Sequence, residues 1–268
     1  MNKNKANRAW ITSLLHQQIS EILVCAQHIK EFPDEIEHVH QFRVRIRHLR
    51  SLLSFFKPYL KRNKTKKLIK TCQSNARHFS LTREMDVLNL TLKDFVHHYP
   101  EHESYVSDWL IKTKHIRESA ISSFHALSII DFLHDSLATN LVKKKATIKK
   151  STLQKRLYKW TKQTIAEVKN IDLSDYQAMH DVRKHVKMIR YINESTSDQL
   201  KCETTDALNS KALSQQLGVL SDVQFIKRLC VYDASSKAIT DFYEYLTNKE
   251  KQAYQSCYQL LEGEKKDE

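Results

Sequence analysis

Two clusters of arginine, lysine and histidine have the residue types and the spacing to bind phosphate groups. The first lies in the segment HQFRVRIRHLR, and its members follow one another at intervals of three, four and three residues: His40, Arg43, Arg47 and Arg50. On an α-helix these intervals place all four side chains on one face, within an arc of roughly 80°. Guanidinium groups hydrogen-bond phosphate oxygens in pairs, so such a face can hold an anionic ligand.

The same arrangement occurs again in the segment HDVRKHVKMIR. Its members have the spacing of the first cluster: His180, Arg183, Lys187 and Arg190. Beside each cluster runs an apolar stripe with helical spacing, formed by Phe42, Ile46 and Leu49 in the first segment and by Val182, Val186 and Ile189 in the second. Each segment is therefore predicted to form a helix that packs by its apolar stripe and presents a row of positive charge beside it.

Other basic residues could extend the two rows into a longer track. They are Lys66, Lys70, Arg77, Lys112, Arg117, Lys155, Arg156 and Lys159. For these residues a solvated helix face, or pairing with Glu and Asp of neighbouring helices, is an equally good explanation. The same alternative applies to the two clusters, but a row of arginines without an anion is unfavourable because like charges repel.

The whole chain is basic, with 44 Lys and Arg against 31 Asp and Glu and a net charge of +13. A surplus of this size predicts a polyanionic partner, such as a nucleic acid, an anionic membrane or a phosphate polymer. No segment approaches the roughly 20 apolar residues of a membrane span, and the N-terminal segment MNKNKANRAW lacks the apolar stretch of a signal peptide. The five scattered cysteines are those of a reducing compartment, so we expect a cytoplasmic protein: Cys25, Cys72, Cys202, Cys230 and Cys257.

The elements that position the clusters are predicted to be helices throughout. Two glycines and three prolines are too few for the turns and bulges of a sheet protein, so the sequence predicts an all-α fold with short connections. Apolar periodicity predicts helices over about 8–31, 35–56 and 63–79, a fourth that ends at about 98, and a long fifth over about 109–137 that a kink could divide. Further helices are predicted over about 153–169, 176–194, 204–217, 221–246 and 249–262. Gly218 is predicted to end the helix before it, and the lysine-rich segment 143–150 to separate two halves of the chain.

These halves form an internal repeat within one domain that covers residues 1–268. The first half covers about 7–142 and the second about 150–262, and each contains one cluster. A predicted turn follows each cluster, Ser80–Glu84 in the first half and Gly218–Asp222 in the second. We therefore expect two similar antiparallel helical bundles related by a pseudo-two-fold axis, which would bring the two basic rows together.

The pattern resembles the CHAD domain, a helical domain named for its conserved histidines. H-x-x-R-V-x-x-R-x-L-R in the first half and H-x-x-R-x-x-x-K-x-x-R-Y in the second carry the resemblance. R-E-M-D-V at Arg83–Val87 and L-G-x-x-x-D at Leu217–Asp222 extend it, so that it covers about residues 7–262. The sequence departs from the family pattern at His48, Glu84 and Lys184, and where Phe79-Ser80 replaces Leu-Gly.

This resemblance implies two bundles around a basic central cavity or pore. It also implies binding of inorganic polyphosphate and, in several members, association with polyphosphate granules. Carried over by position, the ligand-facing residues are the eight of the two clusters. Polyphosphate suits them chemically as well, because its closely spaced charges need many basic donors and no platform for stacking bases.

Two other functions remain as alternatives. Nucleic-acid binding is allowed by charge, although no helix-turn-helix, zinc-finger or RNP-type pattern is present. A metal-dependent phosphohydrolase, acting on polyphosphate or phosphate esters, could use some of the 14 histidines, but no HExxH, paired HD or P-loop pattern occurs. We therefore expect no catalytic residue, metal or cofactor.

The sequence also predicts the roles of some other polar residues. Acidic residues near the clusters are predicted to orient arginines or cap helices: Glu84, Asp86 and Asp222. Histidines near Pro100 are predicted to be solvated: His97, His98 and His102.

Overall fold

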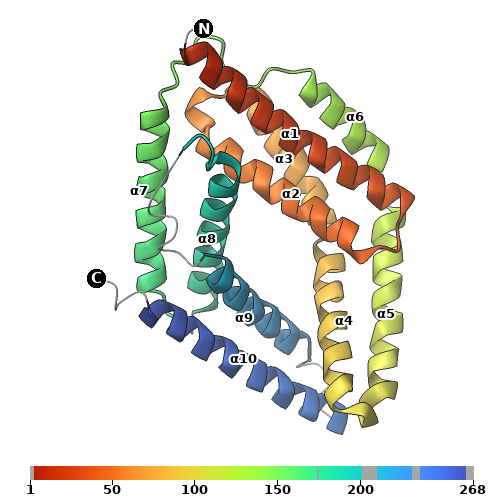
Figure 1. The fold of residues 1–268 in the computed structure, drawn as a ribbon. Coiled ribbons are helices and arrows are strands. Elements are labelled where there is room, and N and C mark those ends of the chain that lie inside the picture. The colour runs from red at the N-terminus through yellow and green to blue at the C-terminus, as the bar shows by residue number, and fades with distance from the viewer. Residues whose placement is uncertain (1–2, 174, 201–209, 231–235, 264–268) are drawn as a thin grey trace. The chain divides into compact units, whose positions relative to one another are not determined.

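The protein is all-α throughout the residues that its computed structural model describes, which are 3–173, 175–200, 210–230 and 236–263. They form ten α-helices and no strand, although Leu60 and Val142 make one isolated antiparallel bridge. Figure 1 shows the order of the helices along the chain. The prediction of an all-α fold is confirmed.

The helices have the following bounds: α1 Lys3–Glu31, α2 Ile36–Phe55, α3 Arg62–His78, α4 Ser80–His98, α5 Glu103–Ser122, α6 Ala126–Leu137, α7 Lys150–Lys169, α8 Tyr176–Thr196, α9 Ser210–Cys230 and α10 Lys237–Gly263. Two short 3-10 helices, Lys57–Tyr59 and Pro100–His102, contain a proline at their start. Because proline fixes φ and lacks an N–H group, it ends the preceding α-helix at both places.

The chain forms two compact units. Unit 1 contains Met1–Asp86, Thr113–Lys155 and Tyr191–Lys201, and unit 2 contains Val87–Lys112, Arg156–Arg190 and Cys202–Glu268. The boundaries fall inside α4, α5, α7 and α8, so each unit includes segments from both halves of the sequence repeat. The first basic cluster belongs to unit 1 and the second to unit 2.

The core of unit 1 forms where α1 packs against α2 and α6 (Figure 1). The predicted stripe of α2 is confirmed, since Phe42, Ile46 and Leu49 are each 0% exposed. Phe42 also meets Phe79 and Phe124 edge to face, at centroid distances of 6.0 and 5.7 Å. This burial fixes the rotation of α2, and therefore the direction in which its basic face points.

The core of unit 2 contains the predicted stripe of α8. Val182, Val186 and Ile189 are buried in one cluster with apolar side chains of α9 and α10, which pack closely on each other: Leu213, Leu217, Leu220, Ala253 and Cys257. Burial of the stripe fixes the rotation of α8 and therefore the side on which its basic residues lie. In both α2 and α8, the buried apolar stripe thus sets the position of the basic cluster.

Several predicted helix boundaries were wrong. The helix predicted over about 221–246 does not exist as one element, because residues 221–230 belong to α9 and α10 begins at Lys237. The long helix predicted over about 109–137 is two helices, since α5 ends at Ser122 and α6 begins at Ala126. Ser80–Glu84 is the first turn of α4, and only Phe79 separates α4 from α3. Gly218 lies inside α9, and no glycine in the described part of the chain has a positive φ. Helix α10 continues without a break where an end near Leu246 was predicted. The predicted helix start at 204–209 lies outside the described residues. In α9 the burial of Leu213, Leu217 and Leu220 outweighs the roughly 1 kcal/mol that glycine costs inside a helix.

Candidate functional site

The first cluster forms one wall of a small basic pocket in unit 1. Arg43, Arg47 and Arg50 of α2 face Gln73, Ala76 and Arg77 of α3 and Ser80 of α4 across a space of about 180 Å³. We call this space the arginine pocket. Four of its lining residues are arginines and none is acidic. Sequence reasoning assigned Arg77 only to an extension of the track, whereas the structure places it opposite the cluster.

Arg43 is held in position by the protein itself. Its Nη1 donates hydrogen bonds to the carbonyl oxygen of Ala76 and, at 3.1 Å, to Oγ of Ser80. Burial, followed by repulsion from Arg47, lowers the pKa of Arg43 to about 10, while the Glu84 carboxylate acts in the opposite direction. Arg43 therefore stays charged at neutral pH and forms a fixed inner edge of the pocket.

Among the described residues, no carboxylate forms an ion pair with the other three arginines of the pocket. Arg47, Arg50 and Arg77 are exposed, and none of them has an acidic group within 4.0 Å in the described part of the chain. Burial, followed by repulsion from Arg47, lowers the pKa of Arg50, and Arg77 adds to the effect. This concentration of like charge favours an anion in the pocket.

His40 lies outside the arginine pocket. It is half-buried on α2, one turn before Arg43, and is not among the lining residues. The structure therefore groups the three arginines of the predicted cluster with Arg77 and separates them from the histidine.

The second cluster lies on α8 in unit 2, and all four of its side chains are half-buried. The imidazole of His180 stacks on the ring of Tyr176, with centroids 6.0 Å apart and planes at 15°. The Arg183 guanidinium lies against Gly218 of α9, where an added Cβ would approach Nη2 to 3.3 Å. Gly218 thus leaves space for an arginine of the cluster, a role that sequence reasoning missed because the glycine matched a helix-end pattern.

The predicted extension residues have different surroundings. Lys66, Lys70, Lys112, Lys155 and Lys159 are exposed. Arg156 lies over the ring of Trp160, with its guanidinium carbon 4.6 Å from the centroid. This contact is a cation–π interaction, which orients the guanidinium without neutralising it.

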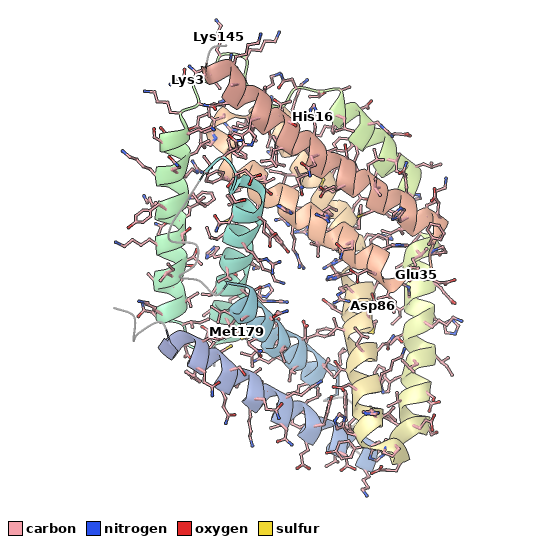
Figure 2. All side chains as sticks on the ribbon, in the orientation of Figure 1. Lys3, His16, Glu35, Asp86, Lys145 and Met179 are labelled. Atoms are coloured by element: carbon pink, nitrogen blue, oxygen red, sulfur yellow. The ribbon has the colours of Figure 1, made fainter. Side chains whose placement is uncertain are left out.

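Arg117 is already engaged inside unit 1. Its Nη1 lies 3.3 Å from Oδ1 of Asp86, and its Nη2 donates to the carbonyl oxygens of Pro33 and Glu35 at 3.1 and 2.9 Å. Figure 2 labels Glu35 and Asp86, the two places that this arginine connects. Burial raises the pKa of Asp86 even though Arg117 acts in the opposite direction. The contacts agree with the prediction that Asp86 orients an arginine.

His48, one of the residues at which the sequence departs from the family pattern, is buried. Its Nε2 lies 2.9 Å from the carbonyl oxygen of Tyr191 and within hydrogen-bonding distance of Oγ of Ser195, and its ring stacks on that of Tyr191. Burial lowers the pKa of His48, partly offset by the hydrogen bond to Tyr191. His48 therefore acts in the core of unit 1 and contributes no fixed charge at neutral pH.

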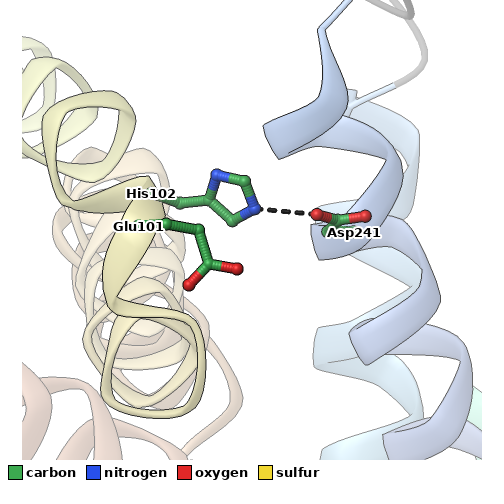
Figure 3. Close-up of side chains that lie close together, drawn as sticks. All are labelled: Glu101, His102 and Asp241. Carbon is green, nitrogen blue, oxygen red and sulfur yellow. Dashed lines mark hydrogen bonds and ion pairs between the residues drawn. The ribbon is translucent and has the colours of Figure 1, made fainter.

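One group of potential metal ligands occurs among the described residues. One ligand atom from each of Glu101, His102 and Asp241 lies within 4.8 Å of the others (Figure 3). Nε2 of His102 is hydrogen-bonded to Oδ2 of Asp241 at 2.8 Å, and its ring stacks on Phe95 at 5.5 Å. His102 thereby connects the 3-10 helix Pro100–His102 to α10. The prediction that His102 is solvated was wrong, since it is only 8% exposed, whereas His97 and His98 are exposed as predicted.

Two solved structures share the fold of this chain over at least 95% of its length. None of the helices in the described ranges is long and apolar enough to cross a membrane. A search of curated proteins finds no match. The crystal structure of the CHAD domain from the plant Ricinus communis superposes with a TM-score of 0.73 and 17% identity, covering 96% of this chain and 91% of that one.

A second solved structure, PptA from Streptomyces chartreusis, superposes with a TM-score of 0.71 and 13% identity, covering 95% of this chain and 99% of that one. Identities this low establish a shared fold and nothing more. The sequence model of the CHAD domain matches residues 13–230, which include both basic clusters. The chain therefore belongs to the CHAD domain family.

Proposed function

We propose that this protein binds inorganic polyphosphate and catalyses no reaction on it. The observation that carries the proposal is the arginine pocket, where four arginines converge and no acidic residue is present in the lining. Arg43 is pre-positioned by Ala76 and Ser80, which reduces the entropy lost when a ligand binds. The three exposed arginines then supply paired hydrogen bonds to phosphate oxygens.

The lining of the arginine pocket also favours a phosphate polymer over a nucleic acid. Proteins that bind single-stranded nucleic acids combine a basic groove with aromatic side chains on which bases stack. The lining of the arginine pocket contains arginine, glutamine, serine, alanine and isoleucine, and no aromatic residue. A chain of phosphates without bases matches this composition.

In this proposal the second cluster, on α8, also binds polyphosphate. The eight residues of the two clusters are His40, Arg43, Arg47, Arg50, His180, Arg183, Lys187 and Arg190. Two bundles related by a pseudo-two-fold axis around a basic cavity would let both rows contact one polyphosphate chain. The track would continue over Arg77 and the exposed lysines. It omits Arg117, because Asp86 and two carbonyl oxygens already engage its guanidinium.

We further propose a cytoplasmic protein that associates with polyphosphate granules. The five scattered cysteines support the first part, and the resemblance to CHAD domains implies the second. Granule association would need no additional site, since a granule presents the same polymer to the two rows. Co-localisation of the fluorescently tagged protein with stained granules, and its loss in the arginine variant described next, would test this part.

The deciding experiment is a titration of the protein with polyphosphate, RNA and DNA at matched charge and salt. We expect polyphosphate to bind most tightly and to displace RNA. A variant with R47Q, R50Q, R183Q and R190Q should lose binding while its helical circular dichroism stays intact. Arg43 is left unchanged because it also supports α3 and α4.

The matched control carries four charge-removing changes at exposed lysines outside the clusters: K30Q, K93Q, K162Q and K251Q. This control should bind like the natural sequence. Equal loss in both variants would show that net charge alone drives binding and would overturn the site. Tighter binding of RNA would favour the nucleic-acid alternative. Release of orthophosphate with Mg²⁺ or Mn²⁺ would favour the phosphohydrolase.

A further inference from the structure

We propose that the polyphosphate path in unit 1 continues from the arginine pocket into a second basic pocket along the groove between α2 and α3. This inference rests on the proposed function and adds a subsite that neither basic cluster contains. The second space, which we call the lysine pocket, measures about 750 Å³. Its basic lining residues are Lys57, Arg62, Lys66 and Lys143, and no acidic residue lines it.

Helical spacing places the two pockets one after the other in the same groove. On α2 the lining residues Arg43, Arg47, Arg50 and Ser54 continue at intervals of four, three and four residues. On α3 the lining residues Arg62, Lys66, Gln73 and Arg77 likewise share one face. The two helices pack on each other, so these faces border a common groove. Arg50 and Ser54 are separated by only about 6 Å along the helix axis, since each residue rises about 1.5 Å.

An isolated pairing of two loops completes the lysine pocket. Leu60 bridges to Val142, Lys61 N donates to the Leu141 oxygen at 2.9 Å, and Lys143 N donates to the Tyr59 oxygen at 2.9 Å. This pairing brings Lys143, which is distant in sequence, to the end of α2. The lysine-rich segment that marked a boundary between sequence halves therefore supplies one of the four basic groups.

The lysine pocket offers free donors as well as charge. Lys57, Arg62 and Lys66 are exposed, and none has a carboxylate within 4.0 Å among the described residues. Nζ of Lys143 donates one bond to the Pro58 oxygen at 2.9 Å, which leaves two of its three donors. Thr65, at 6% exposure, also lines the pocket, and its hydroxyl has no hydrogen-bond partner within the described ranges. These groups can hydrogen-bond the oxygens of a phosphate chain, while Leu53, Pro58, Leu60 and Ile69 form the apolar part of the lining.

Two successive subsites make binding depend on the length of the polymer. A tripolyphosphate occupies one pocket at a time, so removing the lysine pocket leaves its binding to the arginine pocket intact. A long polyphosphate bound in the arginine pocket meets the lysine pocket at high effective concentration. Removing the lysine pocket should therefore weaken long chains selectively.

The test compares the variant K57Q/R62Q/K66Q with the control K30Q/K93Q/K162Q, which removes the same charge at exposed sites outside the groove. Calorimetric titrations use sodium tripolyphosphate and long-chain polyphosphate. We expect the variant to lose about tenfold or more in affinity for the long chain, in line with avidity effects. The control should change little, and the tightest tripolyphosphate site should persist in both.

The outcomes separate this inference from the proposed function. No binding of long polyphosphate by the natural sequence would overturn the proposed function itself. If R47Q/R50Q/R77Q abolishes binding while K57Q/R62Q/K66Q behaves like the control, the arginine pocket stands and the lysine pocket is refuted. The single charge reversal Arg62→Glu gives a second measurement that changes only one exposed side chain, and it should weaken the long chain in the same selective way.

Discussion

His48 stands at a position where CHAD domains commonly carry a further arginine, and the structure gives it a different role. The imidazole ring of His48 stacks on the ring of Tyr191, and its Nε2 hydrogen-bonds the carbonyl oxygen of Tyr191 in α8. Because the buried imidazole is paired with a carbonyl oxygen, its position is determined by packing inside unit 1. His48 lies on a different side of α2 from the basic row and adds no positive charge to it.

This environment predicts that stability depends on pH. Burial lowers the pKa of His48 in the folded protein below its ordinary value, so the unfolded chain binds the proton more readily. The contribution of His48 is therefore complete above the unfolded pKa, near 6.5, and is lost as the pH falls below it. The free energy of unfolding, measured with denaturant at several pH values, should fall on acidification, and less so in His48→Gln. Parallel curves for both proteins would contradict the prediction.

Arg117 shows that a basic residue next to a predicted track can have a structural role. We expect Arg117→Met to destabilise the protein by about 3 kcal/mol, because it leaves the buried Asp86 carboxylate without its partner. Affinity for polyphosphate should be unchanged. Urea denaturation and a polyphosphate titration together measure the two effects.

The double variant Arg117→Met/Asp86→Asn provides the control. It should recover part of the lost stability, because no unpaired charge remains buried. If Arg117→Met instead kept normal stability and bound polyphosphate more weakly, Arg117 would be a ligand-binding residue of the predicted basic track.

At the scale of the elements, the two cluster helices could be predicted from sequence and their partners could not. The apolar stripes of α2 and α8 determine both the helix and its buried side, and periodicity reveals them. Arg77 and Lys143 reach their pockets only through the packing of α3 on α2 and the pairing of Leu60 with Val142. Such contacts depend on tertiary structure, which local spacing does not encode.

Gly218 shows that a local sequence pattern can also predict wrongly. The pattern predicted the end of a helix at Gly218, but the packing of α9 continues the helix through it. Gly218→Ala should add up to about 1 kcal/mol of helix stability. Its Cβ would lie 3.3 Å from Nη2 of Arg183 and displace the flexible guanidinium. We therefore expect thermal stability to stay equal or rise while polyphosphate affinity falls several-fold, as calorimetry would show. The change Gln215→Ala, at an exposed site of the same helix, serves as the control. Unchanged affinity in Gly218→Ala would mean that Arg183 makes no ligand contact.

At the scale of the whole molecule, the number of basic groups that contact the polymer determines how binding responds to salt, and the net charge of +13 shows that basic groups are in excess. Binding to a polyanion releases condensed counterions, so the logarithm of affinity should fall linearly with the logarithm of salt concentration. Each basic contact that is removed should reduce the slope by about one. Titrations of the natural sequence and of Arg47→Gln/Arg50→Gln over a range of salt concentrations test this. Equal slopes would place the bound phosphates elsewhere on the surface.

Arg43 has a structural role at the end of α3 and a role in the lining of the arginine pocket, and mutation of the residue affects both. The carbonyl oxygen of Ala76, which it engages, is one of the last in α3 and has no partner within that helix. The same guanidinium therefore terminates a helix and lines the pocket. A genetic screen for lost binding would rank Arg43 first even if it contributed little affinity, since its loss would loosen the junction between α3 and α4. For the same reason, the freedom of this position to vary in evolution is limited by folding as well as by the ligand.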